Sequence, residues 1–170
     1  MVSRINRKWI GWVSIFAVAI GAIIAGSGVS WSAQADTLQI AREFLAKHEK
    51  RLHDIERDLS DIAIAQKAPS FEYDIADNLR ESASESEDSL TSIGVLVDVY
   101  AAVSCDRAKI RPMILSHVSL QSKLLDLRIS DVSRGVANTS VPGTAVTGAH
   151  LRDQLRAAKD TLDLLGDLRQ

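Results

Sequence analysis

The sequence predicts an all-α protein, an antiparallel four-helix bundle whose long helices carry a heptad pattern and follow an N-terminal signal peptide. Apolar residues recur every three to four positions through most of the chain, whereas the two-residue alternation of strands is almost absent. Glycine and proline interrupt this pattern at intervals and divide it into four segments. Four helices with short connections are typical of an antiparallel bundle.

The start of the chain has the order of a secretory signal peptide. Arg4, Arg7 and Lys8 precede a charge-free, mostly apolar stretch over residues 9–28. The small-residue sequence Ser-Ala-Gln-Ala follows and ends at Ala35. This order predicts export by the general secretory route and cleavage after Ala35.

Two segments follow from this interpretation: a signal peptide over residues 1–35 and a helical bundle domain over residues 36–170. We expect the domain to be periplasmic or secreted. The alternative is an uncleaved anchor through residues 9–28, which approach the roughly 20 residues that span a bilayer. Contact with the membrane is expected only through the signal segment, and only if that segment is not cleaved.

Composition argues against nucleic acid as a partner. The chain has 20 basic and 22 acidic residues, and removal of the three basic signal residues leaves 17 against 22, a formal charge of −5. A net acidic chain is poorly suited to bind DNA, RNA or anionic membranes. All three tryptophans precede residue 36, so few aromatic side chains remain for stacking on bases or sugars.

The first helix is expected over residues 36–67, where a proline at position 69 stops it. Its leucines repeat every seven residues, at Leu38, Leu45, Leu52 and Leu59. This heptad pattern also fits an alternative fold, an extended coiled-coil oligomer built on the first helix.

The second helix is expected to start near Ser70. Its main row is Ala76, Leu79, Ala83, Ser86, Leu90, Ile93, Val97, Tyr100 and Ser104. Residues 81–88 are acidic and serine-rich, and serines favour local backbone hydrogen bonds over helix, so continuity there is left open. The later half is apolar nearly all round, which indicates burial on more than one side.

The third helix is expected to begin between residues 108 and 112 and to end near residues 134–135. Its apolar row is Ile114, Val118, Leu125, Ile129 and Val132, and Leu120, Leu124 and Leu127 are expected to widen that face. A loop is expected over residues 138–148, with Pro142-Gly143 as its turn and Thr147 as the cap of the last helix. That helix carries Leu151, Leu155, Ala158, Leu162 and Leu165.

Two sets of residues are candidates for contact with a partner. Val95, Val99 and Ala102 lie off the main row of the second helix, so they form a dimer interface if they remain exposed in the monomer. The acidic segment offers either a solvated helix face or a docking patch for a basic partner, through Glu81, Glu85, Glu87 and Asp88.

His48, Glu49 and His53 are the candidate metal ligands. Their spacing is one residue longer than in the His-Glu-x-x-His zinc motif, which turns the two histidines apart by about 140° on a helix. The alternative interpretation places His48 at the edge of the apolar row and His53 in solvent. The lone Cys105 suits either a small buried side chain or a disulfide between two chains.

The sequence carries no phosphate-binding glycine loop, nucleophile elbow or haem-attachment motif. We therefore expect no enzyme activity and no cofactor. The leading hypothesis is an exported, non-catalytic helical bundle that binds a protein partner or itself in the cell envelope. The alternative is a periplasmic, sensory four-helix bundle that binds a small ligand or a metal.

Overall fold

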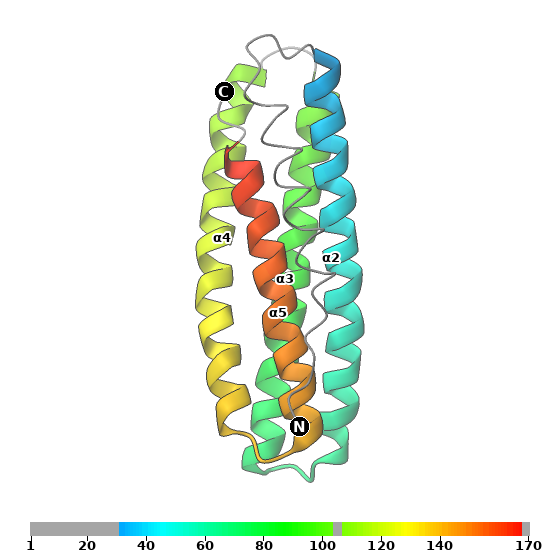
Figure 1. The fold of residues 1–170 in the computed structure, drawn as a ribbon, viewed down its shortest axis with the longest axis vertical. Coiled ribbons are helices and arrows are strands. Elements are labelled where there is room, and N and C mark those ends of the chain that lie inside the picture. The colour runs from blue at the N-terminus through cyan, green and yellow to red at the C-terminus, as the bar shows by residue number, and fades with distance from the viewer. Residues whose placement is uncertain (1–30, 104–106, 168–170) are drawn as a thin grey trace, which may run out of the picture. The chain divides into compact units, whose positions relative to one another are not determined.

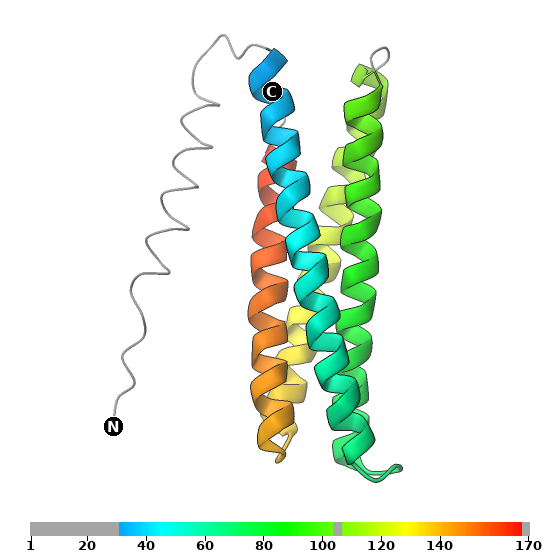
Figure 2. The same cartoon turned by 90° about the vertical axis from the view of Figure 1, so that its right-hand side faces the viewer.

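The computed structural model describes residues 31–103 and 107–167, and these residues form four helices and no strand. The helices are α2 (Trp31–Ala65), α3 (Phe71–Ala102), α4 (Arg107–Asn138) and α5 (Pro142–Asp167). Each described helix runs opposite to the one before it, as two views at right angles show (Figure 1 and Figure 2). The expected all-α class is confirmed, and the arrangement is that of a helical bundle.

The chain divides into two units, Met1–Ile40 and Ala41–Gln170. The described part of the first unit, residues 31–40, is helical and forms the start of α2. The helix thus begins before the expected residue 36, in a stretch whose alanines and glutamine favour helix. Residues 1–30, which hold the basic and apolar parts of the expected signal peptide, lie outside the described residues.

The core of the second unit is made by apolar rows, one from each helix. Fully buried members are Leu45, Leu52 and Leu59 on α2, Leu90 and Ile93 on α3, Val118, Leu125 and Val132 on α4, and Leu151, Leu155 and Leu162 on α5. Full burial of each of these side chains stabilises the folded state by about 1.5–3 kcal/mol relative to leaving it exposed to water. The apolar period of the sequence predicted these rows correctly, because residues three, four and seven apart share one face of a helix.

One expectation about the core is wrong. Leu120 and Leu127 do not widen the buried face of α4, because both are largely exposed. Each lies two residues beyond a buried valine or leucine, Val118 or Leu125, and two residues turn a helix by about 200°. The two leucines therefore lie on the outer face of α4.

α2 ends at Ala65, two residues before the expected position, and the Ala68–Pro69 peptide bond is cis. α3 then starts after Ser70, whose side-chain oxygen accepts a hydrogen bond from the backbone N–H of Tyr73 at 3.2 Å. A serine cap of this kind satisfies one of the free N–H groups at a helix start. α3 is continuous through residues 81–88, which answers the question that the sequence left open.

The expected boundaries of the last two helices are wrong in several places. α4 begins at Arg107, one residue early, and continues to Asn138, beyond the expected glycine stop. The expected loop over residues 138–148 is reduced to residues 139–141, and Thr147 lies inside α5 rather than at its cap. Proline at the first position explains the early start of α5, since its fixed φ suits a helix and its missing N–H costs no bond there.

A carboxylate from another helix holds this short connection. Glu72, in the first turn of α3, accepts hydrogen bonds from the hydroxyl and the backbone N–H of Ser140, at 2.6 and 2.8 Å. It also accepts one from the Thr139 hydroxyl at 2.5 Å. The bonds from Ser140 and then Thr139 lower the pKa of Glu72. The connection between α4 and α5 is thereby tied to the start of α3.

Long side chains join α2 to α3. The Arg42 guanidinium donates to Asp98 of α3 at 3.1 Å and pairs with Glu49 of its own helix at 3.2 Å. It lies directly against Gly94, where an added Cβ would come within 2.6 Å of the guanidinium. The absence of a side chain at Gly94 therefore makes room for an arginine from the neighbouring helix.

Gly148 lies where three helices meet. It belongs to α5, and a Cβ there would lie 2.7 Å from Val136 of α4 and 3.0 Å from Leu79 of α3. The β-branched Val136 side chain has little rotational freedom in a helix, so it cannot move aside cheaply. The close approach of α4 and α5 at this level thus depends on glycine.

Gly148→Ala is expected to lower the free energy of unfolding by about 1–2 kcal/mol, because overpacking outweighs the gain in helix propensity. Gly166→Ala is the matched control on the same helix, since a Cβ there meets nothing within 4 Å. That substitution is expected to raise stability by up to about 1 kcal/mol. Urea unfolding of both variants checks the opposite signs, and two changes of the same sign would contradict this account.

Candidate functional site

The predicted interaction residues of α3 remain on the surface. Val95, Val99 and Ala102 are all exposed, and their spacing of four and three residues places them along one outer face of the helix. These residues were expected to form a dimer interface if they remain exposed in the monomer, and in the single chain they are exposed.

A second exposed apolar row lies on α4, and sequence reasoning missed its meaning. Met113, Leu120 and Leu127 are 72%, 53% and 63% exposed, and they follow each other at intervals of seven residues. Seven residues make almost two turns, so the three side chains lie along one line on the outer face. The seven-residue spacing is visible in the sequence, but Leu120 and Leu127 were expected to face the core, and Met113 was not considered.

The two rows lie on neighbouring helices. Ser92 of α3 and His117 of α4 approach each other across the pair, with Oγ and Nε2 3.4 Å apart. Val95 follows Ser92 by about one turn, and Met113 and Leu120 lie one turn on either side of His117. We call the six residues Val95, Val99, Ala102, Met113, Leu120 and Leu127 the α3–α4 apolar surface.

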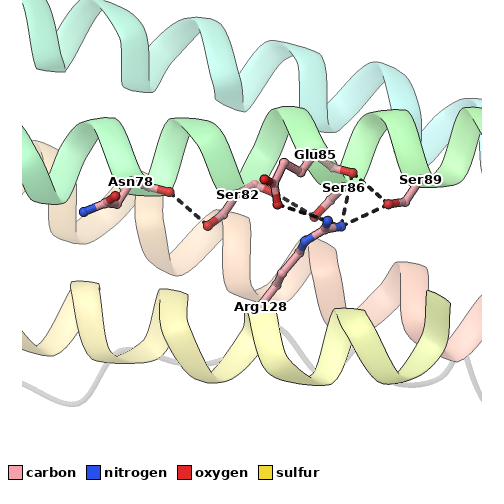
Figure 3. Close-up of polar contacts among 6 residues, drawn as sticks. All are labelled: Asn78, Ser82, Glu85, Ser86, Ser89 and Arg128. Atoms are coloured by element: carbon pink, nitrogen blue, oxygen red, sulfur yellow. Dashed lines mark hydrogen bonds and ion pairs between the residues drawn. The ribbon is translucent and has the colours of Figure 1, made fainter. Parts of the chain in front are cut away.

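An arginine of α4 pairs with the acidic segment of α3. Arg128 donates from Nη2 to the Glu85 carboxylate at 3.1 Å and from Nη1 to the Glu85 backbone carbonyl, also at 3.1 Å. Nη1 further contacts the hydroxyls of Ser89 and Ser86, at 3.1 and 3.4 Å (Figure 3). Hydrogen bonds to a charged group contribute about 1.5–3 kcal/mol, so this cluster fixes α4 against α3.

The serines of this segment bond within the helix rather than interrupting it. Each serine hydroxyl on this face donates to the carbonyl four residues earlier: Ser82 to Asn78 at 2.9 Å, Ser86 to Ser82 at 2.6 Å and Ser89 to Glu85 at 2.8 Å (Figure 3). The local backbone bonds that were expected to compete with the helix are made within it. Because serine is small, it also leaves room for Arg128.

The four carboxylates proposed as a docking patch do not form one surface. Glu85 is directed to Arg128 on α4, whereas Glu87 faces α2, where its carboxylate lies 3.4 Å from Nδ1 of His53. Glu81 and Asp88 are exposed. Two of the four acidic groups are therefore paired within the chain, and they are paired on opposite sides of α3.

His48, Glu49 and His53 are not brought together. His48 points into the bundle and is 5% exposed, Glu49 pairs with Arg42, and His53 is exposed. Of these three, His53 joins a different group of potential metal ligands, made with Glu56 of its own helix and Glu87 of α3. Sequence reasoning missed both glutamates as partners of His53, because Glu87 lies on another helix and Glu56 was not among the candidate ligands.

His48 is held by a chain of hydrogen bonds to α5. The Gln154 amide donates to Nδ1, and Nε2 lies 3.0 Å from the Thr161 hydroxyl, which itself donates to the carbonyl of Ala157 at 3.1 Å. This pattern suits a neutral imidazole with its proton on Nε2. Burial, together with the nearby cations Arg51 and Lys47, lowers the pKa of His48 from 6.5 to about 4.

Acid is therefore expected to destabilise the fold through His48. Between pH 6.5 and about 4 the unfolded chain binds a proton that folded His48 does not, so stability is present above this range and lost as the pH falls through it. The loss amounts to at most about 3 kcal/mol. Urea unfolding at several pH values gives the free energy of unfolding as a function of pH. We expect this free energy to fall less steeply with acid in His48→Gln than in the unmodified chain. The control His150→Gln, at an exposed histidine, is expected to keep the pH dependence of the unmodified chain. An equal pH dependence in all three proteins would contradict this assignment.

An open hollow of about 300 Å³ lies between α4 and α5. It is lined by Val118, Ser119, Ser122, Lys123, Leu162, Asp163 and Gly166. Its acidic group is already bonded, because the Asp163 carboxylate accepts from the Ser122 hydroxyl and from Lys159, both at 2.6 Å. Of its four polar side chains, Ser122 and Asp163 are thus bonded to each other, which leaves Ser119 and Lys123 for the small-ligand alternative. Cys105, the candidate for an intermolecular disulfide, lies outside the described residues.

Comparisons with protein families, with curated proteins and with solved structures find no match to this chain. None of the helices in the described part of the chain combines the length and the apolar character that crossing a membrane requires. Function is therefore argued from the arrangement of the residues themselves, and the α3–α4 apolar surface is the candidate functional site.

Proposed function

We propose that this chain is an exported, non-catalytic antiparallel bundle that associates with a second copy of itself through the α3–α4 apolar surface. The observation that carries the proposal is the exposed row Met113, Leu120 and Leu127 on α4, the helix next to the one that exposes Val95 and Val99. Single exposed apolar residues are common on protein surfaces, but rows of large ones on adjacent helices mark interaction sites.

The spacing of the row favours a helical occupant. A seven-residue repeat on one face is the pattern by which two helices pack along their length. A second copy supplies that same pattern, and a two-fold axis brings identical rows together, as in most homodimers. Self-association therefore needs no complementary partner beyond the chain itself.

The charges argue against the rival proposal of docking to a basic protein through residues 81–88. Arg128 and His53 already contact Glu85 and Glu87, so a basic partner would have to displace groups of the same chain. The apolar rows carry no such competition. Association driven by apolar burial is the better supported of the two.

Export rests on the order of residues 1–35. Cleavage after Ala35 would remove only the first five residues of α2 and leave the whole second unit, which starts at Ala41. We infer that the bundle acts in the periplasm or outside the cell, and that two copies associate there.

Leu120→Glu is expected to weaken self-association at least tenfold, about 1.4 kcal/mol, because it places a carboxylate in an apolar contact. The check is sedimentation equilibrium of the purified chain over micromolar concentrations. Ile64→Glu is the matched control, since Ile64 is 77% exposed but lies near the end of α2.

A chain that stays monomeric at these concentrations would overturn the proposal, as would equal weakening by both substitutions. Circular dichroism of the variants shows whether the bundle is intact, so a loss of association is not confused with unfolding.

Cleavage is tested separately, by expressing the chain in bacteria and measuring its mass in the envelope fraction. The expected product begins at Asp36 and lacks every tryptophan of the chain. Recovery of the intact 170-residue chain would instead support an uncleaved anchor. Replacing Ala33 and Ala35 with leucine should leave the precursor uncut, because the cleavage site requires small residues.

A further inference from the structure

We propose that His53, Glu56 and Glu87 form a binding site for a divalent transition metal ion, with Zn²⁺ as the best-fitting ion. The three side chains come from two helices: His53 and Glu56 from α2, and Glu87 from α3. One ligand atom of each lies within 4.8 Å of the others. The proposal does not depend on self-association, since the residues lie between α2 and α3 rather than on the α3–α4 apolar surface.

The ligand atoms lie close to the separations that a metal ion would impose, and one of these separations already matches. Two ligand atoms bound at about 2.0–2.1 Å in a tetrahedral site lie about 3.3 Å apart. Nδ1 of His53 is 3.4 Å from Oε2 of Glu87 and 3.9 Å from Oε2 of Glu56. The first distance already fits, and the second requires a movement of about half an ångström by the side chain of Glu56 or His53.

Glu56 is held so that one oxygen faces the site. Its Oε1 lies 3.6 Å from Arg80 of α3, while Oε2 faces His53. Arg80 is in turn fixed by Asp77, to which it donates at 2.8 Å, and this hydrogen bond raises the pKa of Arg80. Residues that bond to the ligands of a metal orient them, and Arg80 and Asp77 occupy that position here.

The chemistry of the ligands selects the ion. One imidazole nitrogen with two carboxylates suits Zn²⁺, whereas Mg²⁺ and Ca²⁺ prefer ligand sets made of oxygen alone. Three protein ligands leave the fourth position for water, and the His53 side chain is 61% exposed, so an ion can enter from solvent. A bound ion would link α2 to α3 through ligands from both helices, at a position where only side-chain contacts join them without it.

The same three residues can instead form an ion pair between protonated His53 and the two glutamates, and a titration separates the two interpretations. The untagged full chain is titrated with Zn²⁺ by calorimetry, and its thermal unfolding is followed with and without Zn²⁺. We expect one ion per chain, a higher melting temperature in its presence, and binding that persists in excess Mg²⁺.

His53→Ala and Glu87→Gln are each expected to weaken Zn²⁺ binding at least tenfold. His150→Ala and Glu81→Gln are the matched controls, one exposed histidine and one exposed glutamate outside the site, and should bind as the unmodified chain does. Far-UV circular dichroism verifies that all four variants remain folded. If His53→Ala does not fold, Glu87→Gln still tests the site, because glutamine has nearly the same shape as glutamate.

Absence of Zn²⁺ binding by the unmodified chain would overturn the proposal. So would equal affinity in the site and control variants, which would indicate adventitious binding by surface side chains.

Discussion

The structure depends on one constraint, the burial of a single apolar row from each of four amphipathic helices. No helix can bury its own row, so each helix requires the others, and the second unit packs as one. The approach of the helices is limited by the residues between the rows. Gly148 lets α5 come close to α4 and α3, while Gly94 lets the Arg42 guanidinium fill the space between α2 and α3.

Buried polar side chains such as His48 and Ser122 find partners on another helix, whereas Gln121 Oε1 and Thr144 Oγ1 are buried without a hydrogen-bond partner among the described residues. A buried polar group without a hydrogen bond costs about 1–3 kcal/mol, which gives these bonds a role in alignment as well as in stability. His48 is bonded to Gln154 and Thr161, and Arg128 to Glu85 and Ser89. A shift of α2 along α5 would break the first set and a shift of α3 along α4 the second, so together they specify which turns face each other.

The two proposals concern different helix pairs that share α3. Outward-facing residues of α3 and α4 supply the apolar surface for a second copy, whereas Glu87 on the other side of α3 joins His53 and Glu56 of α2. The acidic segment of α3 contacts both neighbouring helices. Glu85 is directed to α4 and Glu87 to α2. A segment that resembled a uniform acidic patch is thus a set of separate contacts.

The sequence alone determined the helical class and nearly every buried row, because periodicity is a local property that each helix carries in its own residues. It also supplied the stop before α3, through proline. Only the tertiary structure decided that Leu120 and Leu127 face outward, that His48 is buried, and that Glu85 serves Arg128. Those outcomes depend on residues far apart in the chain, 43 positions in the case of Glu85 and Arg128, which meet only when the helices pack.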